Sequence, residues 1–147
     1  MSNLVIKIAN FPKDFPAIQA IRREVFQQEQ KVDAALDFDG KDEISEQLIA
    51  YLDGQAVATA RIRYLDDNTA KIERLAVLPI ARGQGIGKRM MEKALEIIAM
   101  KNIPKAVINA QEYVKKMYEN LGFQEVGERF EEAGILHIKM IKVLETQ

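Results

Sequence analysis

Three glycines and three cationic residues are interleaved in the segment 82–89, which reads Arg-Gly-Gln-Gly-Ile-Gly-Lys-Arg. The segment joins a strand-like run to a helix-like run, and the first backbone N–H groups of a helix have no partner inside the helix. Glycine lets the backbone approach an anion closely, and Arg82, Lys88 and Arg89 add positive charge. The sequence therefore predicts a binding site for a phosphate-bearing ligand at this bend.

Spacing excludes two common nucleotide-binding loops. A Walker A loop has four residues between its first glycine and a Gly-Lys pair, but only three separate Gly83 from Gly87. Serine or threonine should then follow the lysine, and Arg89 stands there instead. A dinucleotide-binding loop has a third glycine three residues after its second, where Lys88 follows Gly85. A plain strand-to-helix bend is the remaining alternative, and the adjoining cations make the anion site the favoured interpretation.

Hydrophobic periodicity places this bend inside a mixed sheet. Alternation predicts strands and helical spacing predicts helices; the predicted strands are 4–9, 47–52, 55–65, 71–78 and 106–110, and the predicted helices are 13–30, 85–101 and 112–121. Asp53-Gly54 predicts a hairpin, 33–46 an acidic loop, Gly122 a helix end, and two further strands finish the chain. We expect an α/β (α+β) fold, a mostly antiparallel sheet with one βαβ crossover.

Composition limits the class of protein. The 147 residues suit one domain, with 48% hydrophobic and 29% charged residues. Lys and Arg number 21 against 22 Asp and Glu, so no overall charge attracts nucleic acid or an anionic membrane. The chain contains no cysteine and no apolar run long enough to span a bilayer, and we expect a cytoplasmic protein.

The motif Arg-x-x-Gly-x-Gly, present as Arg82, Gly85 and Gly87, resembles the signature of the GNAT superfamily of acyl-CoA-dependent N-acetyltransferases. The resemblance continues in 75–79 before the loop and in Met117-Tyr118 with 121–123 after it. A narrower resemblance to the ElaA-like branch is carried by Val25-Phe26, Glu29-Gln30, 37–39, 109–111, 134–137 and Met140. Together these segments cover most of the chain.

The resemblance implies a splayed pair of central strands, with acetyl-CoA as co-substrate between them. It also implies a β-bulge in the fourth strand. The positions expected to contact coenzyme A are Leu75, Ala76, Val77, Arg82, Gly83, Gln84, Gly85, Ile86, Gly87, Lys88, Asn109 and Tyr118. Asn109 has a second interpretation, because with Glu112 it also fits an N-cap and its reciprocal acid.

Acetyl transfer to an amine requires a proton acceptor, because an alkyl ammonium is almost fully protonated at neutral pH. His137, the only histidine, is the first candidate, since it stands opposite the apolar positions Leu136, Ile138 and Met140 of its strand. Glu73 is the second candidate base, although an exposed strand carboxylate is the simpler interpretation.

Tyr118 is the candidate group for the leaving thiolate, because a phenol can hydrogen-bond a thiolate and share its proton. Its alternative is a core tyrosine on the apolar stripe of its helix. Arg22 and Arg74 are candidate ligands of an anionic acceptor, against the alternative of ion-paired or solvated arginines.

The acidic loop resembles part of a calcium loop around Gly40, but Ala35 occupies the position of the leading carboxylate, so no metal is predicted. We expect a small-molecule or protein amine as acceptor and no nucleic-acid or membrane partner. The family resemblance allows a homodimer. Two other functions stay open: acyl-CoA sensing without catalysis, and transfer of another acyl group or to a hydroxyl.

Overall fold

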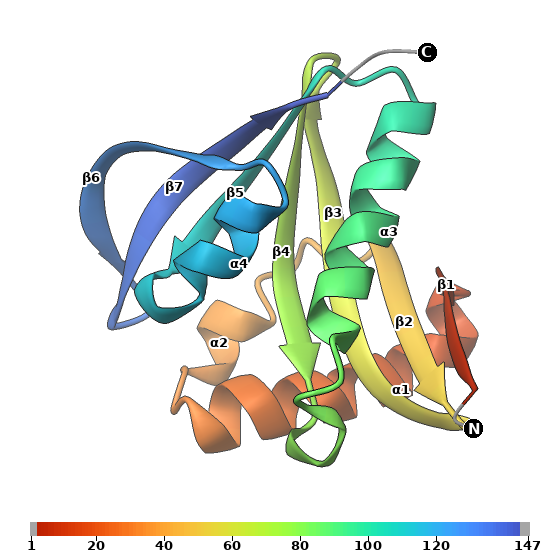
Figure 1. Cartoon of the computed structure of the whole chain (residues 1–147). Coiled ribbons are helices and arrows are strands. Elements are labelled where there is room, and N and C mark those ends of the chain that lie inside the picture. Colours follow the sequence, from red (N-terminus) through yellow and green to blue (C-terminus); the bar gives the residue numbers. More distant parts are fainter. Residues whose placement is uncertain (1–2, 145–147) are drawn as a thin grey trace.

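Antiparallel pairing joins most of a seven-stranded sheet in the computed structural model, which describes residues 3–144 (Figure 1). The strand order is β1-β2-β3-β4-β5-β7-β6. The strands are β1 (Leu4–Ile8), β2 (Glu46–Leu52), β3 (Gln55–Asp66), β4 (Thr69–Val77), β5 (Lys105–Gln111), β6 (Gln124–Glu132) and β7 (Ile135–Val143). The helices are α1 (Phe11–Arg22), the π-helix η1 (Arg23–Glu29), α2 (Ala34–Asp37), the 3-10 turns η2 (Pro79–Ala81) and η3 (Glu112–Val114), α3 (Ile86–Met100) and α4 (Lys115–Asn120).

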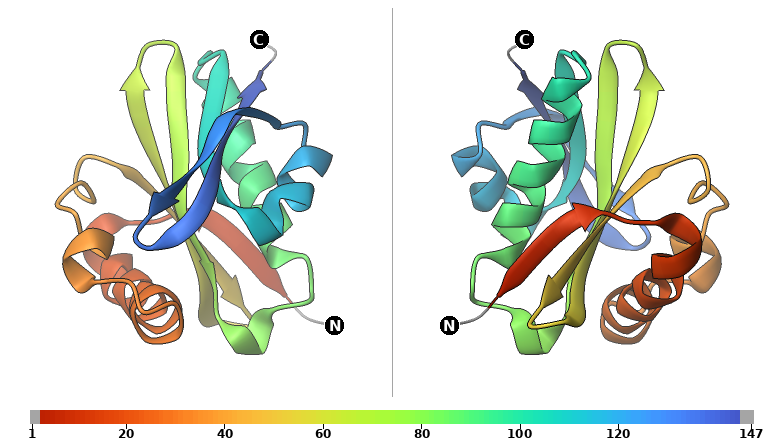
Figure 2. Two further views of the ribbon diagram at one scale, coloured as in Figure 1. Left: turned by 90° about the vertical axis from the view of Figure 1, so that its left-hand side faces the viewer. Right: turned by 90° about the vertical axis from the view of Figure 1, so that its right-hand side faces the viewer.

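The predicted fold is confirmed. Only β4 and β5 are parallel neighbours, and α3 is the crossover between them. Figure 2 shows α1 and α2 on one side of the sheet and α3 and α4 on the other. The short helix α2 is missed by the sequence pattern, because four residues are too few to show helical periodicity. No helix within residues 3–144 is long and apolar enough to cross a membrane.

The parallel strands β4 and β5 separate soon after they begin to pair. Thr69, Ala70 and Lys71 pair with residues 105–107, and no pairing follows, although β4 continues to Val77. The two strands therefore form the predicted splayed pair, which Figure 1 shows opening toward the start of α3.

A β-bulge interrupts β4 where it pairs with β3. Thr59 pairs with Ala76 and Arg61 pairs with Glu73, so β4 carries one residue more than β3 over this stretch. Arg74 within the stretch has φ 58°, in the left-handed region that a residue with a side chain rarely adopts. The bulge that the family resemblance implied is thus present, at Arg74 and Leu75.

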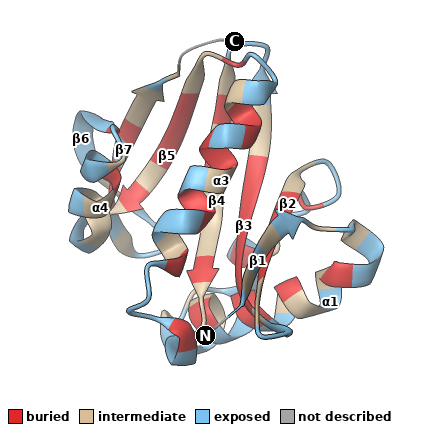
Figure 3. Ribbon diagram, turned by 45° about the vertical axis from the view of Figure 1, so that its right-hand side comes forward, coloured by how far each residue is buried: buried red, intermediate tan, exposed pale blue. Residues whose placement is uncertain are grey.

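Helix α3 packs through a continuous apolar stripe. The stripe predicted from the sequence is buried, and it consists of Ile86, Met90, Ala94, Leu95 and Ile98. Figure 3 shows this buried face turned toward the sheet and the exposed face turned outward. Because α3 contacts both β3 and β4, its N-terminus is held at the open end of the splay.

The opposite face of the sheet is covered by α1 and η1. Asn10 accepts a hydrogen bond from Lys13 N, and the buried Asp14 accepts one from Asn10 N, which fixes the start of α1. The predicted helix 13–30 is found, but its last turns are π-helical, with Gln30 N donating to Val25 O. Ile21 and Val25 pack on Ala76 beside the bulge. The helix therefore lies directly against the splayed part of β4.

A buried ion cluster fastens the acidic loop to this face. Arg22, which is fully buried, donates from Nε to Asp37 at 3.0 Å and from Nη1 to Asp42 at 2.6 Å. Arg61 is also fully buried and contacts Asp39, Asp42 and the Glu73 carboxylate. Since each carboxylate faces a guanidinium, the loop can be buried without an unpaired charge.

The substitution Arg22→Met tests how much this ion cluster contributes to the stability of the fold. It leaves Asp37 and Asp42 buried without their main cation, so we expect a loss of roughly 3 kcal/mol in the free energy of unfolding. Urea unfolding followed by circular dichroism measures the loss. The exposed neighbour supplies the control Arg23→Met, with an expected change within about 0.5 kcal/mol. Equal losses in both variants would contradict the role of the cluster.

Candidate active site

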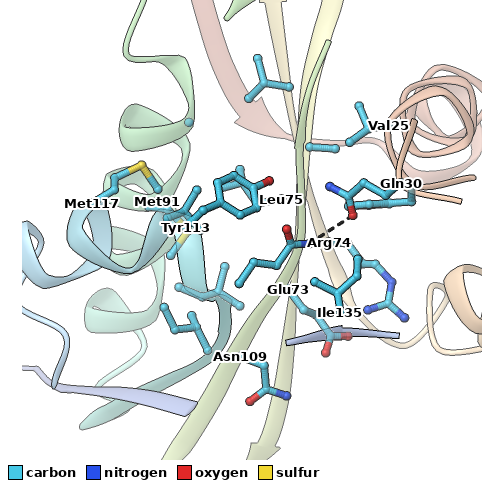
Figure 4. Close-up of a pocket in the computed structure, with 18 of the residues that line it drawn as sticks. Val25, Gln30, Glu73, Arg74, Leu75, Met91, Asn109, Tyr113, Met117 and Ile135 are labelled. Carbon is cyan, nitrogen blue, oxygen red and sulfur yellow. Dashed lines mark hydrogen bonds between the residues drawn. The ribbon is translucent and has the colours of Figure 1, made fainter. Parts of the chain in front are cut away.

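A cavity of about 920 Å³ occupies the splay between β4 and β5. Its walls are formed by η1, the second half of β4, the loop before α3, the end of β5, α4 and the turn between β6 and β7. Figure 4 shows lining side chains from both faces of the sheet around β4. The cavity thus passes between two strands that would otherwise be hydrogen-bonded neighbours.

The helix start at one end of the cavity offers free backbone donors. Gly85 is the N-cap of α3 with φ 76°, a conformation that glycine adopts without strain, and no side chain caps the helix. The first intrahelical bond runs from Arg89 N to Gly85 O at 3.1 Å, so the N–H groups of 86–88 have no intrahelical acceptor. Because 85–88 line the cavity, this end suits an anion such as a diphosphate.

Gly87 leaves space for a ligand beside the start of α3, because it has no side chain. A Cβ atom built on it would lie 3.8 Å from Val77 Cγ2, an ordinary contact, and would meet no other protein atom within 4 Å. The fold therefore does not require glycine at this position. The free space beside Gly87 belongs to the cavity, where a ligand can approach the backbone.

The Arg82 side chain holds the loop against η1. Its guanidinium donates to both carboxylate oxygens of Glu29, at 2.7 and 2.6 Å, and to Val77 O at 2.9 Å. The hydrogen bonds from Arg82 lower the pKa of Glu29. Arg82 lines the cavity, and these three hydrogen bonds use three of its five N–H donors. Its guanidinium therefore positions the loop, and its contact with the phosphate stays a prediction.

Tyr118 projects from α4 into the cavity. It is 8% exposed and packs edge-on against Phe123, with 6.0 Å between the ring centroids. Its hydroxyl makes no hydrogen bond within residues 3–144, and burial raises its pKa to about 12. The phenol therefore stays protonated at neutral pH and can donate a hydrogen bond to a ligand atom. Phe123 N and Gly122 N close the end of α4 on Tyr118 O and Glu119 O, which fixes this helix.

His137 lies across the cavity on β7 and is oriented by its neighbours. Nδ1 lies 2.7 Å from Ile135 O, and the ring stacks on Phe130 at 5.9 Å. A carbonyl oxygen can only accept a hydrogen bond, so Nδ1 carries a proton, and in the neutral ring the lone pair is on Nε2. Glu132 Oε2 lies 3.7 Å from Nε2 and can stabilise a protonated ring. In the same strand Leu136 is 49% exposed, so the predicted apolar stripe is limited to Ile138 and Met140.

Glu73 lines the cavity as a firmly ionised carboxylate. Burial alone would raise its pKa, but hydrogen bonds from Arg63 and Arg61, with the nearby charge of Lys71, outweigh burial and lower the pKa to about 2. A carboxylate with so low a pKa is a weak proton acceptor at neutral pH. Its surroundings therefore favour His137 over Glu73 as the base.

Comparison with known proteins places this geometry in a family. The family model described as an acetyltransferase (GNAT) domain matches residues 11–144. The chain belongs to the GNAT acetyltransferase family. The uncharacterised protein YyaT of Bacillus subtilis is 36% identical over 125 residues, covering 83% of this chain and 84% of YyaT. Protein ElaA of Escherichia coli is 33% identical over 111 residues, covering 72% of each chain.

Solved structures that are similar to this chain lead to the same family as the relatives found by sequence. The crystal structure of Escherichia coli ElaA matches with a TM-score of 0.81 and 26% identity, over 97% of this chain and 99% of that one. The structure of a GNAT acetyltransferase from Elizabethkingia anophelis with acetyl-CoA bound has a TM-score of 0.77 at 17% identity, over 97% and 99% of the two chains, and shares the fold. These findings support the ElaA-like branch of the GNAT family.

The predicted GNAT site residues are mostly brought together. Of the positions expected at coenzyme A, all except Gln84 line the cavity: Leu75, Ala76, Val77, Arg82, Gly83, Gly85, Ile86, Gly87, Lys88, Asn109 and Tyr118. Asn109 Nδ2 donates to Glu132 Oε1 at 3.3 Å, and the 3-10 turn η3 begins only after Gln111, so the predicted N-cap at Asn109 is wrong.

The two arginines predicted for the acceptor differ in placement. Arg22 is fully buried in the ion cluster and does not line the cavity, so its predicted contact with the acceptor is corrected to a structural role. Arg74 lines the cavity, donates to Leu36 O at 2.9 Å and to Asp37 O at 3.2 Å, and pairs with the Asp39 carboxylate at 3.3 Å, so it is ion-paired as the alternative interpretation has it. Its Nη1 makes no hydrogen bond within residues 3–144.

Several cavity residues carry no predicted role in the sequence. Gln30 and Gln111 face each other from η1 and β5, and Tyr113 and Met91 contribute to the wall beside Tyr118. The two glutamines could have been singled out in the sequence because each is a polar residue at or next to the end of a predicted helix or strand. Their pairing depends on two segments that only the tertiary fold brings together.

The substitution Gly87→Ala tests the helix start as a diphosphate site. Alanine meets no protein atom closely and is the better helix former, so stability should stay equal or rise by up to about 1 kcal/mol. The new methyl group fills the space beside the free amides, and we expect coenzyme A to bind at least about 10-fold more weakly, roughly 1.4 kcal/mol. Calorimetric titration and thermal unfolding measure the two effects. Unchanged affinity would exclude this backbone as the phosphate contact.

Proposed function

We propose that this protein transfers an acetyl group from acetyl-CoA to a primary amine by direct attack in a ternary complex. The observation that carries the proposal is the continuous cavity from the free amides of α3 to the bulge in β4, with Tyr118 and His137 on its walls. Membership of the GNAT family supports acyl transfer from an acyl-CoA donor. The amine and the acetyl preference are proposed from the site.

The donor is proposed to bind with its diphosphate at 86–88 and its pantetheine arm in the splay. The unpaired edges of β4 and β5 offer backbone donors and acceptors there, because pairing between these strands ends at Lys71 and Val107. An extended arm with amide groups can hydrogen-bond to such edges as an added strand would. The thioester then lies near the bulge, at Arg74 and Leu75.

The acceptor amine must lose a proton before or during its attack on the thioester carbonyl. His137 is proposed as the acceptor of that proton through Nε2, because Nδ1 is engaged with Ile135 O. The nitrogen forms a bond to the carbonyl carbon as the carbon–sulfur bond breaks. The positive charge on the ring is then stabilised by Glu132.

Tyr118 is proposed to donate a hydrogen bond to the departing thiolate. Its pKa of about 12 lies above that of a thiol, near 8.5, so the phenol stabilises the thiolate without giving up its proton fully. Burial strengthens this hydrogen bond, since water competes poorly in the cavity. Arg74 is proposed as the cation beside the acceptor, where Nη1 remains free for an anionic group.

A screen with acetyl-CoA tests the proposed reaction. The purified chain is incubated with a panel of amines, amino acids and lysine peptides, and released thiol and product mass are recorded. We expect stoichiometric release of coenzyme A and a product carrying one acetyl group on nitrogen. Binding of the donor without turnover of any amine would favour the non-catalytic acyl-CoA-binding function. Products acylated on oxygen would point to transfer to a hydroxyl.

The variants Tyr118→Phe and His137→Ala test the residue roles. Each removes one proton-handling group, and such groups typically contribute 10²–10⁴-fold, so we expect kcat to fall about 100-fold or more. Affinity for coenzyme A should change less than about threefold, because the diphosphate site is untouched. Tyr51→Phe, which removes a hydroxyl that donates to Asp14 from β2 outside the cavity, is the matched control: it loses a hydrogen bond of the fold but should keep kcat. Full activity in both test variants would refute the roles.

A further inference from the structure

Two glutamine side chains meet across the cavity. Gln111 Nε2 donates to Gln30 Oε1 at 3.1 Å, and the dashed line in Figure 4 marks this hydrogen bond. Gln30 caps the C-terminus of η1, Gln111 is the last residue of β5, and both line the cavity. The bridge thus connects the helix on one face of the sheet to the strand on the far side of the splay.

The bridge and the bulge line the same cavity. Pairing between β4 and β5 ends at Lys71 and Val107, and Gln111 ends β5 beyond that point. Leu75 and Arg74, the bulge residue with positive φ, line the cavity with Gln30 and Gln111. A ligand that starts at the free amides of α3 and fills the splay can therefore contact both the bulge and the bridge.

Apolar side chains contribute to the cavity wall on the side of η1. Val25 and Phe26 from η1, Leu36 from α2 and Ile135 from β7 line the cavity, together with the charged Glu29 of η1 and Asp37 of α2. These elements, apart from β7, lie on the face of the sheet opposite α3 (Figure 2). An acyl chain of several carbons would have favourable contacts with this wall if it could pass the two amides.

We propose that the Gln30–Gln111 bridge limits the acyl group of the donor to a short one such as acetyl. This inference rests on the proposed function, because it assumes an acyl-CoA donor in the splay. A longer chain must displace the bridge and leave two half-buried amide groups beside methylene groups, where they lose their hydrogen bond. A pocket that discriminates by one methylene group typically does so by 10–200-fold. The two glutamines are therefore specificity-determining residues for the acyl group.

Binding of a chain-length series tests the gate without requiring an acceptor. Dissociation constants are measured by calorimetry for coenzyme A, acetyl-CoA, butyryl-CoA and hexanoyl-CoA. We expect the wild type to bind hexanoyl-CoA at least about 10-fold more weakly than acetyl-CoA. Gln30→Ala and Gln111→Ala should each reduce that ratio about 10-fold, while the affinity for coenzyme A itself stays within about threefold.

The exposed residue Gln28, also in η1 and outside the cavity lining, supplies the matched control Gln28→Ala, with an unchanged ratio. Gln30→Asn shortens the side chain by one methylene group and serves if Gln30→Ala does not fold. Equal affinity of the wild type for all chain lengths, or an unchanged ratio in the Gln30 and Gln111 variants, overturns the gate. Failure to bind coenzyme A at all would instead overturn the proposed function, so the two failures are distinguishable.

Discussion

The missing hydrogen bonds between β4 and β5 are the constraint on which the rest of the molecule depends. Two parallel neighbours pair over three residues and then separate, which leaves backbone donors and acceptors facing a cavity inside the sheet. The bulge at Arg74 contributes to this separation, because an extra residue on β4 bends the strand and increases its twist. Everything that a ligand could contact is arranged around that opening.

Such an opening costs stability, and the neighbouring elements offset the cost. On one face α3 buries a full apolar stripe against β3 and β4. On the other face Ile21 and Val25 pack beside the bulge, and Arg22 and Arg61 fasten the acidic loop beneath it. The cluster has a further consequence, since Arg61 also holds Glu73 ionised at the cavity wall. The same charges that stabilise the loop thus decide which side chain can act as a base.

The sequence predicted the elements and the position of the glycine-rich loop at the start of α3 well, because both depend on local signals. Hydrophobic periodicity located the strands, and alternate glycines flanked by cationic residues located the start of α3. The sequence failed where function depends on partners distant in the chain. Arg22 and Arg74 look alike in the sequence, and both pair with carboxylates of the ion cluster, but Arg22 is fully buried whereas Arg74 lines the cavity.

The contacts of Arg82 and Gln30 at the cavity wall also depend on partners that are distant in the sequence. The pairing of Arg82 with Glu29 was not predicted, because the two residues are 53 positions apart in sequence and only the packing of η1 against the loop brings them together. Gln30 and Gln111 had no predicted role, because neither side chain is meaningful until the fold sets them at 3.1 Å. The π-helical turn is part of that placement: it ends with Gln30 N bonded to Val25 O, so Gln30 is fixed on the cavity side.

Several costly features of this protein lie at its cavity. Arg74 has a positive φ, three amides of α3 lack intrahelical acceptors, and the hydroxyl of the buried residue Tyr118 has no hydrogen-bond partner within residues 3–144. Each of these features is locally unfavourable, and each lies where a bound ligand could supply a compensating interaction. A diphosphate satisfies the amides, a pantetheine arm satisfies the strand edges, and a thiolate accepts from the phenol. One extended donor molecule can meet all three needs at once, which a small anion or an apolar ligand cannot. That correspondence is the physical argument for acyl-CoA as the ligand of this cavity.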